Sequence, residues 1–124
     1  MDDRSLLSSF RHAFAGLAYA ARTQPNVRFH ILAAAVVILV ALWLELPLAE
    51  CGILLLTIGL VLVTELVNTA VEVLVDMVSP ERNPKAKVVK DVAAGAVVVA
   101  AIVSVAIGLL LLGPPLWSRV FGGP

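Results

Sequence analysis

The chain has 124 residues, which suits a single domain over 1–124. Hydrophobic residues make up 60% of it and charged residues 15%, whereas soluble proteins average roughly 45–50% and about 25%. A chain of this size cannot bury so much apolar surface, so the composition excludes a soluble globular domain and also excludes disorder. Nine Lys and Arg balance nine Asp and Glu, which gives no positive field for nucleic acid. The composition predicts a small integral membrane protein.

The first segment, about 1–25, is predicted to be an amphipathic helix. With about 100° of rotation per residue, one stripe of the helix is apolar and a different face carries arginines. The stripe contains Leu6, Phe10, Phe14, Leu17 and Ala21, and the other face contains Arg4, Arg11 and Arg22 beside His12 and Tyr19. Such a helix can lie in the headgroup layer of a membrane, either as an anchor or as a gate for substrate.

Three apolar segments at about 28–45, 51–78 and 90–112 are predicted to span the membrane, because a span needs about 20 mostly apolar residues. The third has no charge from Val92 to Leu112 and qualifies alone. The second qualifies only if Glu65 and Glu72 are tolerated near a membrane face. Pro114 and Pro115 are expected to end the last helix. The predicted fold class is an all-α membrane protein with an interfacial helix and three transmembrane helices.

The positive charges predict the orientation of the chain. All Lys and Arg except Arg119 precede the first span or lie between the second and third. The positive-inside rule therefore places the N-terminus in the cytoplasm and the C-terminus outside.

The second span contains an unusual acidic strip. Glu65, Glu72 and Asp76 project within about 40° of one another, with Asn68 and Thr69 on either side. Each carboxylate inside a membrane helix costs about 2.5–3.5 kcal/mol on insertion scales. The strip either stabilises helix packing through hydrogen bonds or serves a cation, a proton path or a catalytic base.

A basic segment follows, from Ser79 to Asp91. On its own it is an ordinary topology determinant. We expect Lys90 at the start of the third span, where the positive end of the helix dipole suits phosphate. Beside the acidic strip, this predicts an anionic ligand with a divalent metal.

These segments resemble a known family. Residues 65–76 (ELVNTAVEVLVD) resemble the signature of the prokaryotic diacylglycerol kinase family, which includes undecaprenol kinases. Residues 86–97 (AKVVKDVAAGAV) resemble its second conserved block, and 10–17 (FRHAFAGL) with 27–30 (VRFH) its N-terminal part. The resemblance covers about 5–112. It implies a three-span lipid kinase of the bacterial plasma membrane, usually a homotrimer with shared cytoplasmic active sites, that uses ATP and Mg²⁺.

The resemblance also implies roles for individual residues. Glu65 would be the general base, Asn68 would orient the acceptor hydroxyl, and Glu72 would bind Mg²⁺ with its ATP. Gln24 stands where the family usually has a second metal-binding glutamate, which reduces the charge at the metal. The remaining ATP-side positions are His12, Glu81, Arg82, Asn83, Lys90 and Asp91, and the remaining lipid-side positions are Phe10, Phe14, Arg28 and Ala94.

Two other classes of protein would account for part of this pattern. A small transporter or proton-coupled subunit would use Glu65 as its coupling carboxylate, but it leaves Asn68, Asp76 and the Lys90-Asp91 pair without a role. A non-catalytic assembly protein would use the polar residues only to join helices. The acceptor lipid stays open between undecaprenol and diacylglycerol, although residues 79–81 and 90–95 are closer to the undecaprenol kinase branch.

Overall fold

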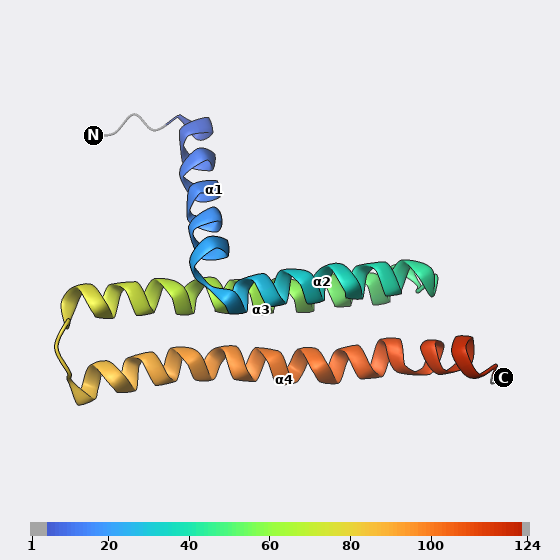
Figure 1. Cartoon of the computed structure of the whole chain (residues 1–124). Coiled ribbons are helices and arrows are strands. Elements are labelled where there is room, and N and C mark those ends of the chain that lie inside the picture. The colour runs from blue at the N-terminus through green and yellow to red at the C-terminus, as the bar shows by residue number, and fades with distance from the viewer. Residues whose placement is uncertain (1–4, 123–124) are drawn as a thin grey trace.

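The structure is a computed structural model that describes residues 5–122. Within this range the chain forms four helices and no strand (Figure 1). They are α1 (Leu6–Thr23), α2 (Pro25–Trp43), α3 (Leu48–Val78) and α4 (Pro84–Phe121). The prediction of an all-helical chain with one short and three long apolar segments is confirmed.

Three of the helices form a bundle, and the fourth stands across it. α3 and α4 run antiparallel along most of their length, and α2 packs chiefly on α3 (Figure 1). α1 rises at a steep angle from the start of α2, near the middle of α3, so the last turns of α3 and the first turns of α4 extend beyond it. The end of the α3–α4 pair that contains their connection therefore lies on the side of α1 away from α2.

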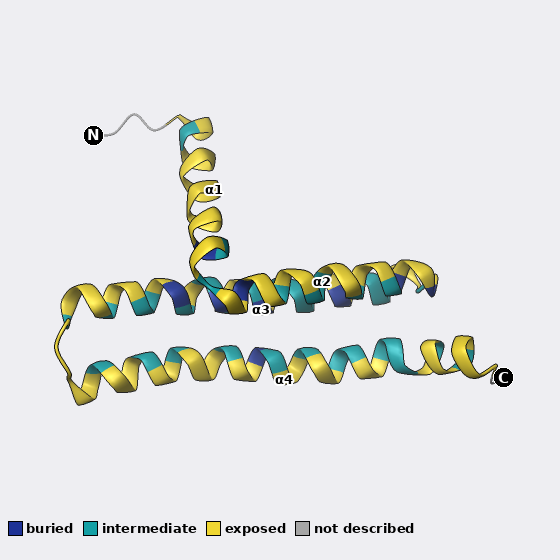
Figure 2. Ribbon diagram, in the orientation of Figure 1, coloured by how far each residue is buried: buried dark blue, intermediate teal, exposed yellow. Residues whose placement is uncertain are grey.

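The bundle has little interior. Its buried apolar residues are few, among them Ala41, Leu54, Val61 and Ala100. Many large apolar residues of α2, α3 and α4 are exposed, and Figure 2 shows exposed residues along all three helices. All three helices are long and apolar enough to cross a membrane. Because water would not tolerate so much exposed apolar surface, these faces require lipid or other copies of the chain.

The connections between helices follow from local sequence. Pro25 begins α2 because its missing N–H would have no helical partner at that position. At the other end, the Leu46 N–H donates to the Ala41 carbonyl at 3.2 Å and the Glu45 N–H donates to Leu42 at 3.1 Å. This Schellman pattern places Glu45 in the left-handed region, with φ of 54°. The short turn lets α3 start at Leu48 and pack directly against α2.

The expected end of the last helix at Pro114-Pro115 is wrong, because α4 contains both prolines and continues to Phe121. Proline removes backbone hydrogen bonds but tolerates helical φ. Contacts with α2 hold the extra turns: Arg119 donates to the Trp43 carbonyl at 3.2 Å, and its guanidinium lies 5.0 Å from the centre of the Trp43 ring. Gly122, with φ of 64°, then ends the helix.

The predicted N-terminal helix is present as α1, although Arg4 lies outside the described residues. Its start is capped by the Ser5 side chain, which accepts a hydrogen bond from the Ser8 N–H at 3.2 Å. Leu6, Phe10 and Phe14 are all exposed. These three residues of the apolar stripe are therefore left uncovered by the other helices of the described residues.

Candidate active site

The acidic strip of α3 passes from the interior of the bundle to its exposed end. Glu65 has only 3% of its surface exposed, and Thr69, one turn further on, has 5%. Glu72 is half-buried and Asp76 is exposed. The helical spacing therefore gives the carboxylates different surroundings, and the innermost, Glu65, is the one that a membrane helix tolerates least.

Glu65 meets a histidine from α2. The His30 Nε2 atom lies 3.1 Å from Glu65 Oε1, and the His30 side chain is 20% exposed. The N–H direction does not meet hydrogen-bond geometry, so Oε1 is buried without a hydrogen bond from any described residue. The Thr69 hydroxyl donates to the backbone carbonyl of Glu65 at 3.0 Å and not to its carboxylate. His30 is thus the nearest counter-group of the buried carboxylate.

Sequence reasoning missed His30 as a site residue. In the sequence analysis His30 appears only within residues 27–30 of the family resemblance. The available signal was one polar side chain between Phe29 and Ile31 at the start of an apolar helix. A polar side chain in an apolar helix needs a polar partner, but only the packing of α2 on α3 identifies Glu65 as the partner of His30.

Asn68 and Glu72 form a second polar pair on α3. The Asn68 amide donates to Glu72 Oε1 at 3.3 Å. Because a carboxylate only accepts, the amide nitrogen must face Glu72 and the Asn68 carbonyl oxygen must point elsewhere. That oxygen is buried and has no partner among the described residues. The pair therefore offers the two carboxylate oxygens of Glu72, held beside the Asn68 amide.

These oxygens suit magnesium, which prefers hard oxygen ligands and is usually held by one or two carboxylates with substrate phosphates and water. The described residues contain no group of three His, Cys, Asp or Glu side chains that could hold a metal alone. The Glu72 carboxylate therefore fits a metal that arrives with other ligands better than a closed structural site.

Lys90 is held between α4 and α3. Its Nζ atom lies 2.5 Å from Asp76 Oδ1. Lys87 makes a separate pair on α4, with its Nζ atom 2.6 Å from Asp91 Oδ2. The neighbouring Lys90 and Asp91 side chains therefore bind different partners, and Asp91 faces the exposed side of the helix.

The prediction that Lys90 stands at the start of its helix is wrong. α4 begins at Pro84, and the Asn83 side chain accepts a hydrogen bond from the Lys85 N–H at 2.9 Å. An Asn cap followed by proline is a standard helix start. Lys90 consequently lies almost two turns inside α4. At that distance from the start of the helix, the helix dipole does not contribute to phosphate binding beside Lys90.

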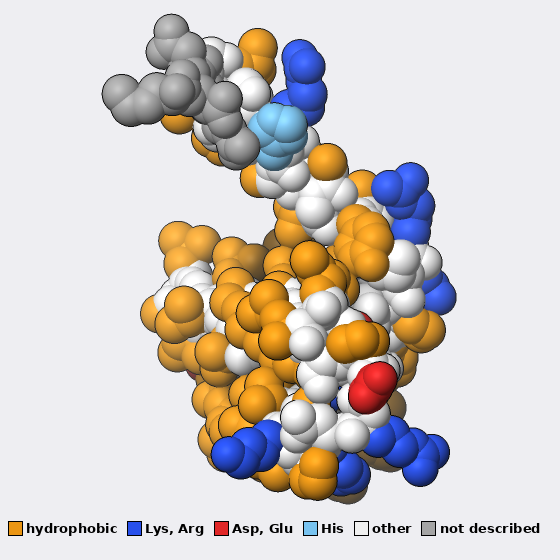
Figure 3. All heavy atoms as spheres, turned by 90° about the vertical axis from the view of Figure 1, so that its left-hand side faces the viewer, with side chains coloured by type: hydrophobic (Ala, Val, Ile, Leu, Met, Phe, Trp, Pro, Cys, Tyr) orange, Lys and Arg blue, Asp and Glu red, His pale blue; other side chains and the backbone are white. Residues whose placement is uncertain are grey.

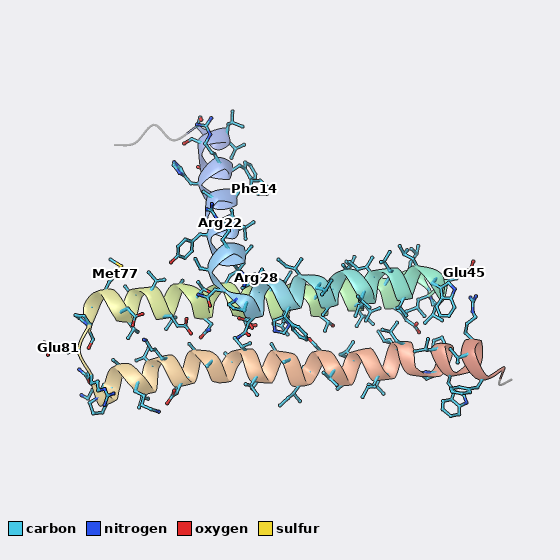
Figure 4. All side chains as sticks on the ribbon, viewed as in Figure 1. Phe14, Arg22, Arg28, Glu45, Met77 and Glu81 are labelled. Carbon is cyan, nitrogen blue, oxygen red and sulfur yellow. The ribbon has the colours of Figure 1, made fainter. Side chains whose placement is uncertain are left out.

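A pocket of about 800 Å³ lies at the connection between α3 and α4. Its polar lining is Asp76, Ser79, Glu81, Arg82, Asn83, Lys87 and Lys90. Figure 3 views this end of the bundle, where Lys and Arg side chains lie around exposed hydrophobic ones. Glu81 is at this end and Glu45 at the opposite end of the bundle (Figure 4). Of the expected ATP-side residues, the pocket gathers Glu81, Arg82, Asn83 and Lys90.

The other expected site residues stay apart within one chain. His12 on α1 and Ala94 on α4 are exposed, and Phe10 and Phe14 are 56% and 66% exposed. Gln24 occupies the break between α1 and α2, and its side chain makes no capping hydrogen bond.

Arg28 has a structural contact. Its guanidinium donates to the carbonyls of Ala21 and Arg22, both at 2.9 Å. These contacts satisfy the last carbonyls of α1 and fix its angle to α2. Figure 4 shows Arg22 and Arg28 together at this junction.

Comparison with known proteins finds chains of similar sequence. The family model for prokaryotic diacylglycerol kinase matches residues 11–112. The chain is 47% identical over 115 residues to a diacylglycerol kinase from Synechocystis, covering 92% of this chain and 66% of the relative. It is 44% identical over 108 residues to the undecaprenol kinase of Bacillus subtilis, covering 87% and 88%. A diacylglycerol kinase from Pseudomonas aeruginosa is 33% identical over 111 residues, covering 89% and 90%.

The helices and the polar site thus define a small membrane-embedded enzyme of the lipid kinase class. The chain belongs to the prokaryotic diacylglycerol kinase family. The resemblance of residues 65–76 to this family is confirmed.

Proposed function

We propose that this protein transfers the terminal phosphate of ATP to the hydroxyl of a membrane lipid, undecaprenol or diacylglycerol, in a reaction that requires Mg²⁺. The observation that carries the proposal is the placement of one buried carboxylate, Glu65, on the same helix strip as Asn68 and Glu72. The strip then leads toward a basic pocket at the end of α3.

The spacing along α3 suits a phosphate transfer between two substrates. Glu65 and Glu72 are seven residues apart, which corresponds to about 10 Å along a helix. An acceptor hydroxyl at Glu65 and a nucleotide phosphate near Glu72 fit within that length. Lys90 and Arg82 line the adjacent pocket, whose volume of about 800 Å³ lies within the usual range for ligand sites.

In the proposed reaction, Glu65 accepts the proton of the lipid hydroxyl as the hydroxyl oxygen attacks the terminal phosphorus of ATP. The bond to ADP breaks and the phosphate stays on the lipid oxygen. Asn68 holds Glu72 in place through its amide, and Lys90 offsets negative charge on the phosphates. Bound Mg²⁺ would supply neutralisation of phosphate charge, with Glu72 as its protein ligand in this chain.

We place this site at the cytoplasmic face, where ATP is present. Lys and Arg concentrate near α1 and at the α3–α4 connection, and the positive-inside rule supports that orientation. α1 stands across the bundle and exposes Leu6, Phe10 and Phe14, which supports a position in the headgroup layer. At that depth Glu65 lies near the membrane interface and Asp76 lies beyond it.

We further propose that the active form is a homotrimer with shared sites. Two observations support it. Large apolar faces remain exposed in one chain, and neither His12 on α1 nor Gln24 after it lines the pocket at the end of α3. A partner could bring such residues together.

A groove between α1 and α3, of about 550 Å³, supports a lipid acceptor. It is lined mainly by apolar side chains, including Leu17 and Met77, and it includes Thr69 beside Glu65. A lipid chain could lie in this groove with its hydroxyl near the carboxylate.

The direct test is a transfer assay with the purified protein in lipid–detergent micelles. Radiolabelled ATP is offered with undecaprenol, with diacylglycerol and without added lipid. We expect Mg²⁺-dependent labelling of at least one lipid alcohol. Labelling of neither lipid, by protein that remains folded, would contradict the proposal and favour the transporter alternative.

A further inference from the structure

The Glu65 carboxylate needs an orienting partner that the proposed mechanism does not itself supply. A base works only when its free oxygen is aimed at the hydroxyl it deprotonates. Oε1 is the buried oxygen without a hydrogen bond, and Glu65 as a whole is 3% exposed. A carboxylate in such a place is stable only beside a donor or a positive charge.

The surroundings leave His30 as that partner. On α3 itself, the Thr69 hydroxyl is occupied by the Glu65 backbone carbonyl. On α4, no charged residue occurs between Asp91 and Arg119. From α1 and its junction, the Arg28 guanidinium is directed to the carbonyls that end α1. His30 Nε2 lies 3.1 Å from Oε1, within reach of a hydrogen bond after a small rotation of the ring.

The position of His30 also gives it an open side. It lines an apolar cavity of about 100 Å³ between α2, α3 and α4, together with Val61 and Ser104. The ring can therefore turn without leaving its contact with Glu65. Its edge packs against Phe29, with ring centres 5.5 Å apart.

We propose that His30 is a positioning residue for the Glu65 carboxylate: its Nε2–H engages Oε1 and leaves Oε2 to take the proton of the acceptor hydroxyl. This inference rests on the proposed function, in which Glu65 is the base. His30 is not required to touch lipid or nucleotide.

The test compares two substitutions of similar size. His30→Gln keeps an N–H donor near the same place, whereas His30→Leu fills the space without a donor. We expect His30→Leu to lower kcat by about 10–100-fold, as expected for a lost hydrogen bond to a charged group, with little change in the KM for ATP. His30→Gln should recover most of the loss. Ser104→Ala, which alters the same cavity away from Glu65, is the matched control and should keep the wild-type kcat.

A double-mutant cycle separates positioning from packing. In a Glu65→Gln background, His30→Leu should cause little further loss, because the carboxylate that it positions is absent. Two independent losses that multiply would overturn the proposal. So would a kcat for His30→Leu within about twofold of wild type or of His30→Gln.

A spectroscopic arm does not depend on activity. The chain has two histidines, His12 and His30, so ring ¹⁵N signals can be assigned with one His12 variant. Glu65→Gln should move the His30 signal and leave that of His12 in place, and an unmoved His30 signal would contradict the contact. Wild-type turnover by Glu65→Gln would instead overturn the proposed base, whatever the His30 signal does.

Discussion

Lys90 on α4 and Asp76 on α3 form an ion pair, with 2.5 Å between Nζ and Oδ1, at the edge of the basic pocket. The pair joins the two longest helices near their connection. It also keeps the lysine at the end of the acidic strip, where a nucleotide phosphate would approach Glu72. The pair therefore connects the packing of the bundle with the proposed binding of ATP.

Lys90→Ala should raise the KM for ATP by roughly tenfold or more, because the proposed hydrogen bond between the Lys90 ammonium and a phosphate of ATP is lost. Steady-state kinetics at saturating lipid measure the effect. Lys87→Ala is the matched control, since Lys87 lines the same pocket but is 77% exposed and paired with Asp91 on its own helix. Exposed pairs contribute little, so the control should change the KM much less. Equal effects of the two substitutions would count against a specific phosphate contact by Lys90.

Glu72→Ala should raise the Mg²⁺ concentration needed for half-maximal activity and weaken the binding of ATP, because the nucleotide arrives with its metal. A magnesium titration at fixed ATP measures the first effect. The substitution also frees the Asn68 amide, so Glu72→Gln, which can still accept that hydrogen bond, is the appropriate control for structure. If both variants titrate like the wild type, Glu72 has a packing role only.

The fold was largely predictable because its signals are local. Three long apolar segments and an amphipathic start define the four helices, and Asn83-Pro84 carries the signal for the start of α4 that the sequence interpretation overlooked. The continuation of α4 through Pro114-Pro115 was not predictable, because it depends on Arg119 reaching Trp43 on another helix.

The site was predictable only in part, because some of its pairs form between residues on different helices. Glu65, Asn68 and Glu72 share one helix face, so their spacing identifies them as a group. The partner of Glu65 is 35 positions earlier in the chain, on α2, and the partner of Lys90 is on α3. Such pairings depend on the register between packed helices, which the pattern of a single helix does not contain.

Substitutions of Gln24, at the junction of α1 and α2, test whether this residue acts at the metal together with Glu72. If Gln24 of one chain reaches Glu72 of a partner, Gln24→Glu adds an anionic ligand and should lower the magnesium requirement by about tenfold, equivalent to about 1.4 kcal/mol. Gln24→Ala is the control for loss of the neutral oxygen. An identical magnesium dependence for all three proteins would remove Gln24 from the site.

The orientation can be tested by cysteine labelling after Cys51 is replaced. A probe at Pro47→Cys, in the α2–α3 turn, should react with an impermeant reagent added outside intact cells, whereas Pro80→Cys, in the α3–α4 connection, should react only after the membrane is opened. The reverse pattern would place the pocket on the side without ATP and exclude a cytoplasmic kinase site.

The most direct test of the central claim is lipid-dependent transfer of the ATP terminal phosphate by Glu65→Gln, measured beside its ATP binding. The substitution keeps the shape of the side chain and removes the base, whose loss typically costs about 10²–10⁴-fold. We predict that turnover falls in that range while ATP binding is retained. Turnover equal to that of the wild type would contradict the assignment of Glu65 as the general base.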